Sequence, residues 1–181
     1  MALLDAARSV LLVVDVQERL HPAIHEADAV LARALWLVRL AKRLDVPVLA
    51  SEQYPEGLGP TVAPLRAELP ADGIRAKRHF SCVADGCFAD HPAWARHQFV
   101  VCGTEAHVCV LQTVLDLRQS GREVYVVEEA VSSRAPRSKA LALERMRRND
   151  IEIVNGEMVG FEWLRRAGDD RFRGILREFL K

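Results

Sequence analysis

The sequence has no excess of charge of either sign and no long apolar run. Its 181 residues include 25 Lys and Arg against 25 Asp and Glu, a formal net charge of zero. This balance disfavours binding by bulk charge attraction to nucleic acid or to an anionic membrane surface. No apolar stretch approaches the ~20 residues of a membrane span, and the order of residues in Met1–Arg8 is wrong for a signal peptide. We therefore expect a cytoplasmic protein whose partner is a small, neutral or weakly charged molecule.

Cysteine is also scarce. Four cysteines in a chain of this length are too few for a disulfide scaffold, and a reducing cytoplasm would keep them as thiols. Cys82 and Cys87 lack the Cys-x-x-Cys spacing of zinc and thioredoxin-like sites, so we interpret them as ordinary thiols. Cys102 lies inside an apolar run and is expected in the core. Cys109 is considered below.

Repeats, low-complexity tracts and linkers are absent as well, and no glycine-rich dinucleotide fingerprint follows the first apolar run. Half of the residues are apolar and 28% are charged, which is the composition of an ordinary globular protein. The length corresponds to about one domain. We expect one domain over residues 1–181, with its function in a site on a single fold.

Short apolar runs alternate with segments of helical periodicity along the chain. Continuous apolar runs are typical of strands buried on both faces. The alternation predicts βαβ units, and hence an α/β fold with a parallel sheet covered by helices on both sides. The expected strands are Ser9–Asp15, Val46–Ala50, Ile74–Lys77, Gln98–Gly103, Glu123–Val127 and Ile151–Val154. The expected helices are Ala27–Leu44, Thr61–Leu69, Val108–Ser120, Ser138–Arg148 and one or two after Gly156, with residues 80–97 mostly loop.

Three chemically reactive side chains follow the expected strands. Asp15 ends the first strand, Lys77 ends the third, and Cys109 follows the fourth after a short turn. Sites on parallel sheets lie at the carboxyl ends of the strands, so the three residues are expected at one edge. Each also has a structural interpretation: Asp15 as a turn cap, Lys77 as a solvated charge, and Cys109 as a small core residue.

Together the three residues make chemical sense as a site. A free thiol is mostly protonated at neutral pH, so a nucleophilic cysteine needs a cation, a helix N-terminus or a base nearby. The first turn of the expected helix and the charge of Lys77 would favour a Cys109 thiolate. Asp15 could take the thiol proton and later give it to a leaving amine.

Three segments of the chain resemble the signature of the isochorismatase-like cysteine hydrolases. They are Val13–Gln17 (VVDVQ), Lys77–Ser81 (KRHFS) and Cys102–Val110 (CGTEAHVCV). The resemblance implies a three-layer α/β/α sandwich with strand order 3-2-1-4-5-6. It also implies Cys109 as nucleophile, Asp15 as general base and acid, and Lys77 as electrostatic partner. The oxyanion hole would be the backbone N–H groups of Glu105 and Cys109, next to a non-proline cis peptide between Thr104 and Glu105.

The same resemblance bears on the subgroup and on cofactors. Members that cleave the vinyl ether lack the cysteine, so Cys109 points to the amidase-like branch. The loop Ser51–Thr61 resembles that of the isochorismatase domain-containing subgroup and has no histidine of the kind that binds metal in nicotinamidase-type relatives. We therefore expect no metal and no cofactor. His21 and His25 are interpreted as surface-loop residues.

Four further residues are candidates for a substrate pocket: Gln17, Glu52, Gln53 and Phe80. Gln53 has an alternative role in satisfying loop backbone, and Phe80 an alternative role in the core. The Gly and Pro residues of the loop after the second strand are explained as turn residues.

The sequence thus predicts a cysteine hydrolase that cleaves a C–N bond of a small amide or ureide through a thioester. The alternatives are hydrolysis of an ester or other non-amide bond by the same residues, and a catalytically idle binding or scaffold protein. We also expect a homo-oligomer, as is common among relatives. The apolar tail would either form the interface or cap the domain's own core; its members are Phe161, Trp163, Leu164, Ile175 and Phe179.

Overall fold

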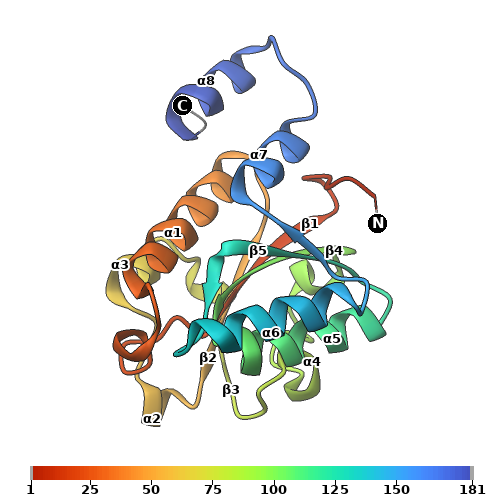
Figure 1. Ribbon diagram of the computed structural model, residues 1–181. Coiled ribbons are helices and arrows are strands. Elements are labelled where there is room, and N and C mark those ends of the chain that lie inside the picture. Colours follow the sequence, from red (N-terminus) through yellow and green to blue (C-terminus); the bar gives the residue numbers. More distant parts are fainter. Residues whose placement is uncertain (1, 180–181) are drawn as a thin grey trace.

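The computed structural model describes residues 2–179, in which strands and helices alternate along the chain (Figure 1). The strands are β1 (Ser9–Val14), β2 (Val48–Gln53), β3 (Ile74–Lys77), β4 (Gln98–Thr104), β5 (Glu123–Ser132) and β6 (Glu152–Val154). The longer helices are α1 (Ala27–Arg43), α5 (Leu111–Gln119), α6 (Pro136–Arg147), α7 (Gly156–Leu164) and α8 (Asp170–Phe179). Single turns form α2 (Pro55–Leu58), α3 (Ala63–Arg66), α4 (Cys82–Asp85), η1 (His21–Ala23), η2 (Ala71–Gly73) and η3 (Pro92–Ala95), and a π-helix forms η4 (Ala106–Val110).

The six strands form one parallel sheet of order β3-β2-β1-β4-β5-β6. This confirms the expected fold class and strand order. The direction in which successive strands are added to the sheet changes between β1 and β4, where Val14 pairs with Gly103. In open α/β sheets, ligands bind at such a switch point, outside the carboxyl ends of the strands. Residues that follow β1 and β4 are therefore placed for function.

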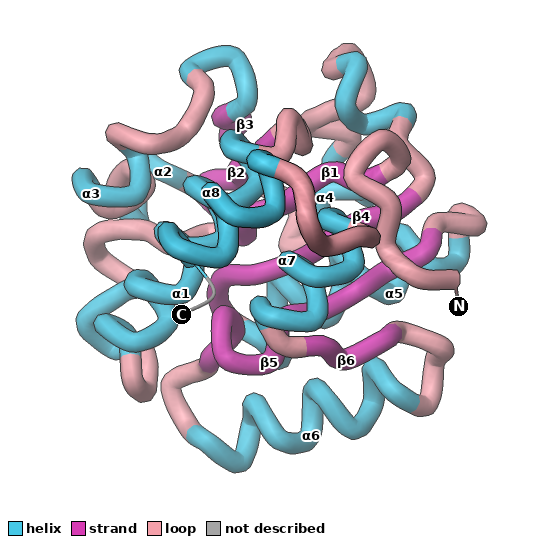
Figure 2. Tube along the Cα trace, turned by 90° about the horizontal axis from the view of Figure 1, so that it is seen from above, coloured by secondary structure: helices cyan, strands magenta, loops and turns pink. Residues whose placement is uncertain are grey.

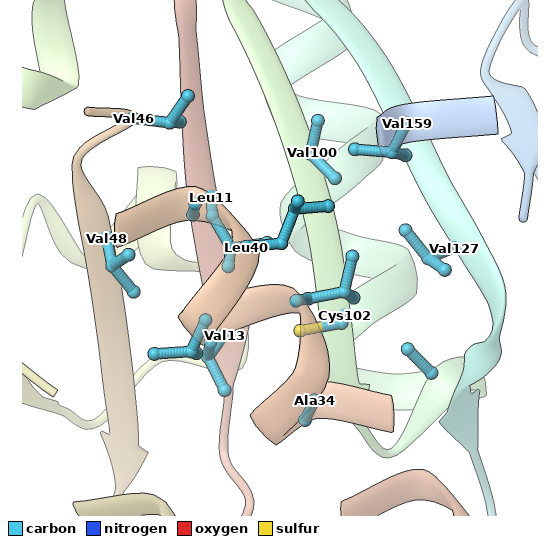
Figure 3. Packing of buried hydrophobic residues seen from close by; sticks show 14 of the residues in the cluster. Leu11, Val13, Ala34, Leu40, Val46, Val48, Val100, Cys102, Val127 and Val159 are labelled. Carbon is cyan, nitrogen blue, oxygen red and sulfur yellow. The ribbon is translucent and has the colours of Figure 1, made fainter. Parts of the chain in front are cut away.

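The central strands are buried on both faces because apolar side chains alternate across them. Leu11 and Val13 of β1 pack with α1, whereas Val10 and Leu12 pack in the opposite layer with α5 and α6. Figure 3 shows Leu40 of α1 among side chains of the first layer. Each fully buried Val or Leu contributes roughly 1.5–3 kcal/mol to stability. The sheet is thus a rigid base for its carboxyl edge.

Helices cover both faces of the sheet. Figure 2 shows α6 alongside β5 and β6, and Figures 1 and 2 show α8 close to α1. The apolar tail caps the core on the α1 side: Trp163 and Ile175 are buried, and the ring of Phe179 lies 5.9 Å from that of Trp36. Of the two roles predicted for the tail, the structure gives most of its residues the capping one. Phe161 is different, with 46% of its surface exposed.

Several element bounds differ from those expected. β2 runs on to Gln53 because Ser51, Glu52 and Gln53 are buried and pair with β3, and β5 runs on to Ser132 because Val131 and Ser132 pair with β4 beyond an irregularity in register. The expected helix over 61–69 is reduced to α3, and the helix expected from Val108 begins as the π-helix η4. No helix of residues 2–179 is long and apolar enough to cross a membrane. Met1, Leu180 and Lys181 of the predicted 1–181 domain lie outside the described residues.

Candidate active site

Asp15 lies immediately after β1 and is completely buried. Its backbone adopts a left-handed conformation with φ of 50°, which costs a non-glycine residue roughly 1–2 kcal/mol. Two hydrogen bonds hold it there: its N–H donates to the Ser51 carbonyl at 3.1 Å, and its carbonyl accepts from the Thr104 hydroxyl at 2.8 Å. The neighbouring strands β2 and β4 thus fix the direction of the carboxylate.

Lys77 is the last residue of β3, and its side chain is buried against Asp15. Its Nζ donates to Asp15 Oδ2 at 2.7 Å, to Gln53 Oε1 at 2.6 Å and to the Phe80 carbonyl at 3.0 Å. Burial alone would lower the pKa of Lys77, but the negative charge of Asp15 and its hydrogen bond with Lys77 raise it. Lys77 therefore remains protonated and neutralises the buried carboxylate.

The turn after β4 brings a third reactive group to this edge. Gly103 has φ of +119°, and a Cβ on it would lie 2.0 Å from the Val14 carbonyl oxygen, so the close approach of β4 to β1 requires glycine. A cis peptide joins Thr104 to Glu105, as the resemblance implied. The π-helix η4 follows and places Cys109 in its second half, with only 6% of the residue exposed.

The Cys109 thiol lies close enough to the Asp15 carboxylate for the two groups to interact. Burial raises the pKa of Cys109, the Asp15 carboxylate raises it further, and Lys77 opposes these effects without cancelling them. The thiolate expected from the helix position is therefore not favoured, because the loss of its hydration on burial outweighs the effect of the Lys77 charge. The thiol is neutral at rest and has a carboxylate next to it that can accept its proton.

The structure therefore brings together Asp15, Lys77 and Cys109, which are far apart in sequence. Lys77 is buried and is therefore not the solvated charge of the alternative interpretation, whereas Cys109 lies both next to Asp15 and within the apolar core. Cys82, interpreted from sequence as an ordinary thiol, is completely buried at the start of α4 and interacts with Ser51, Lys77 and Asp15. Its position five residues after Lys77 is the only sequence signal that could have indicated this.

Three of the candidate pocket residues are engaged inside the protein. Gln17 is buried, donates to the carbonyls of Gln53 at 3.0 Å and Gly59 at 2.7 Å, and accepts from Gln53 N at 2.7 Å. Glu52 accepts from Thr61 N at 2.7 Å and from the Thr61 hydroxyl at 2.8 Å, and it also pairs with Arg66. These bonds organise the loop between β2 and α3.

Phe80, the fourth candidate, is half exposed. With Arg78 and Ser81 it forms part of the lining of a cavity of about 400 Å³, whose opposite wall comes from α5. The carbonyl of Phe80 also holds Lys77, so the segment after β3 connects this cavity to the buried ion pair. The pocket roles of Gln17, Glu52, Gln53 and Phe80 stay predictions.

Among residues 2–179, no group of three or more His, Cys, Asp and Glu side chains is arranged to hold a metal ion. His21 lies 3.6 Å from Asp28, and His25 lies 4.0 Å from Glu26. These are single ion-pair contacts of the loop before α1 and of its first turn.

The isochorismatase domain matches residues 9–157. Isochorismatase domain-containing protein 2A of Mus musculus is 36% identical over 175 residues, covering 92% of this chain and 80% of that protein. The structure of MAR1 ribonuclease from Caenorhabditis elegans is 30% identical with a TM-score of 0.92, covering 99% and 93% of the two chains.

A more distant solved structure is similar to this chain in fold. The YcaC gene product of Escherichia coli, an octameric hydrolase of unknown specificity, is 24% identical with a TM-score of 0.85 and covers 92% of this chain and 84% of its own. The family match extends from the first residue of β1 into α7 and includes all the strands and the edge that carries Asp15, Lys77 and Cys109. This chain therefore belongs to the isochorismatase family.

Proposed function

We propose that the protein is a cysteine hydrolase in which Asp15, Lys77 and Cys109 act together on a C–N bond of a small amide or ureide. The observation that carries the proposal is the buried trio itself. The Lys77 ammonium lies 2.7 Å from Asp15 Oδ2, and the Cys109 thiol interacts with the same carboxylate. Burying an ion pair costs free energy of desolvation. The carboxylate of this pair supplies the base that the neighbouring thiol needs.

The acylation step follows from these contacts. Asp15 takes the proton of the Cys109 thiol as the sulfur attacks the carbonyl carbon of the substrate. The carbonyl oxygen becomes an oxyanion, which the backbone N–H groups of Glu105 and Cys109 would stabilise. Collapse of this intermediate breaks the C–N bond, and the leaving nitrogen takes the proton from Asp15. The product is a thioester on Cys109 and a free amine.

Deacylation repeats the sequence with water. Asp15 removes a proton from a water molecule, the hydroxide adds to the thioester carbonyl, and the C–S bond breaks. The sulfur leaves as a thiol after recovering the proton from Asp15, and the acid is released. Lys77 keeps its charge throughout, because Asp15 holds its proton only transiently and the raised pKa of Lys77 favours the ammonium.

Replacing Cys109 by Ala tests the proposal. We expect the wild-type protein, mixed with a panel of small amides, ureides and esters, to form an acyl-enzyme adduct that intact-mass spectrometry detects. Cys109→Ala should form no adduct and lose at least about 10³-fold in turnover. Cys102→Ala, which changes a buried thiol of β4, is the matched control and should keep both adduct formation and turnover.

The panel also separates the alternatives. Turnover of esters alone would favour the non-amide hydrolase, and turnover that persists in Cys109→Ala would refute the cysteine mechanism. An idle scaffold would show equally slow alkylation of all four thiols. RNA belongs in the panel because the Caenorhabditis elegans protein is named a ribonuclease. The zero net charge of this chain offers no general attraction for RNA.

We also propose a cytoplasmic location and association of copies into a homo-oligomer. The octameric state of the Escherichia coli protein supports association in this fold. So do the exposed side chains of Leu3 and Phe161, which are 59% and 46% exposed. The small-molecule partner and the absence of nucleic-acid and membrane partners stay predictions, as does the single domain.

A further inference from the structure

Strand β2 contributes none of the three proposed catalytic residues, yet two of its side chains hold them. Ser51 Oγ donates to Asp15 Oδ1 at 2.7 Å, and Gln53 Oε1 accepts from Lys77 Nζ at 2.6 Å. Ser51 and Gln53 are two residues apart, so they project from the same face of the strand. Both are buried, with 1% and 8% of their surface exposed.

Ser51 holds Asp15 at two points. Its carbonyl accepts the Asp15 N–H at 3.1 Å, and its hydroxyl binds the carboxylate oxygen that Lys77 leaves free. With one oxygen on Ser51 and the other on Lys77, the carboxylate cannot rotate without losing a hydrogen bond in a buried site. Ser51 thus keeps the proposed base oriented.

Two further hydrogen bonds fix the position of Gln53. Its backbone N–H donates to Gln17 Oε1 at 2.7 Å, and its side-chain Nε2 donates to the Arg78 carbonyl at 2.7 Å. The contact of Nε2 with a carbonyl assigns the amide oxygen to Lys77, because a reversed amide would place an N–H against the ammonium. Gln53 therefore presents a fixed acceptor to Lys77.

We propose that Ser51 and Gln53 are a pair of positioning residues that fix the Asp15–Lys77 ion pair for proton transfer from Cys109. This role rests on the proposed function, and it differs from the substrate contact expected for Gln53. Neither residue needs to touch the substrate. They act by restricting the two charged groups to one geometry, which is what preorganised catalysis requires.

The test uses alkylation of Cys109 by iodoacetamide, which requires no knowledge of the substrate. The rate is measured at its pH optimum by peptide mass spectrometry in the full chain. Ser51→Ala should slow the alkylation about tenfold, the equivalent of one hydrogen bond to a charged group. Ser51→Thr keeps the hydroxyl and should restore the wild-type rate.

Matched controls exist at the opposite edge of the sheet. Ser9 and Gln98 are also a completely buried Ser and Gln, and they hydrogen bond to each other at 3.3 Å near the start of β1 and β4. Ser9→Ala and Gln98→Leu should lower stability without slowing the alkylation of Cys109. If Ser51→Ala gave the same rate as Ser9→Ala, the positioning role of Ser51 would be wrong.

Gln53→Leu extends the test and decides it if Ser51→Ala does not fold. We expect about a tenfold slower alkylation at the pH optimum, and no such change in Gln98→Leu. Because both residues act through one ion pair, the double variant should lose less than the product of the two single losses. A loss in the double variant equal to the product of the two single losses would contradict a shared role.

The outcomes also separate this inference from the proposed function. A wild-type protein in which Cys109 alkylates no faster than Cys87 would overturn both. Fast alkylation of wild-type Cys109 with unchanged rates in Ser51→Ala and Gln53→Leu would overturn only the positioning role.

Discussion

At the scale of single residues, the hydrogen bonds of Lys77 define its part in the site. An ammonium has three N–H donors and no acceptor. All three reach protein oxygens, those of Asp15, Gln53 and Phe80. Lys77 therefore has no donor left for a substrate while these contacts persist, and its contribution is the field of a fixed positive charge on Asp15 and on the Cys109 sulfur.

We expect Lys77→Met to lower the free energy of unfolding by about 3–5 kcal/mol, because it leaves the Asp15 carboxylate buried and unpaired. The measurement is urea unfolding at neutral pH. Arg78→Met is the control: Arg78 is the next residue, and its ion pair with Glu56 is exposed, so the loss should be below about 1 kcal/mol. Equal losses in the two variants would contradict a buried, essential ion pair.

At the scale of elements, the junction between β1 and β4 decides whether the site forms. The two strands approach so closely at Gly103 that a Cβ there would also lie 2.6 Å from the Val14 nitrogen. Asp15 and the turn that carries Cys109 both begin at this junction. The tight contact therefore brings the carboxylate and the thiol together.

Gly103→Ala should destabilise the fold by more than about 3 kcal/mol, since the backbone atoms it would meet cannot move aside cheaply. Gly121→Ala is the matched control. Gly121 also has a positive φ, of +84°, but a Cβ there meets no atom within 4 Å, so only the conformational cost of about 1–2 kcal/mol applies. Thermal and urea unfolding of the two variants compare these costs, and a similar loss in both would show that the strands can separate slightly.

The elements also show what sequence patterns can predict. The strand over Ser9–Asp15 and the helix over Ala27–Leu44 were predicted nearly to the residue, because continuous apolar runs and helical periodicity are local properties. β2 was predicted to end at Ala50 because Ser51, Glu52 and Gln53 are polar. They remain in the strand because Asp15, Thr61 and Lys77, which are distant in sequence, satisfy their side chains.

At the scale of the whole molecule, the buried thiols of Cys102 and Cys109 make the free energy of unfolding depend on pH in the alkaline range. Burial raises the pKa of Cys102 to about 12 and also raises the pKa of Cys109. The same thiols titrate near 8.5 in an unfolded chain. Above that pH the unfolded chain has released protons that the folded protein keeps, so the free energy of unfolding falls as pH rises.

Each such thiol should contribute a slope of about 1.4 kcal/mol per pH unit between its unfolded and folded pKa values. Cys102→Ala should remove one of these contributions, because burial alone shifts the pKa of Cys102. Urea unfolding at several values from pH 9 to pH 10 measures the slope, below the range in which Lys77 also contributes. The small cavity left by the variant lowers stability equally at every pH, so an unchanged slope would contradict the prediction.

The sequence by itself determined the layered α/β architecture and the edge at which the candidate site lies, because hydrophobic periodicity, strand ends and three short segments are local properties of the chain. It also singled out Asp15, Lys77 and Cys109. Only the tertiary structure decided the state of these groups and their supports. These features are the neutral thiol of Cys109, the three occupied donors of the Lys77 ammonium and the hydrogen bond of Ser51 to Asp15. They arise from burial and from distances between strands. Those quantities depend on packing that brings distant segments together, and no local pattern encodes them.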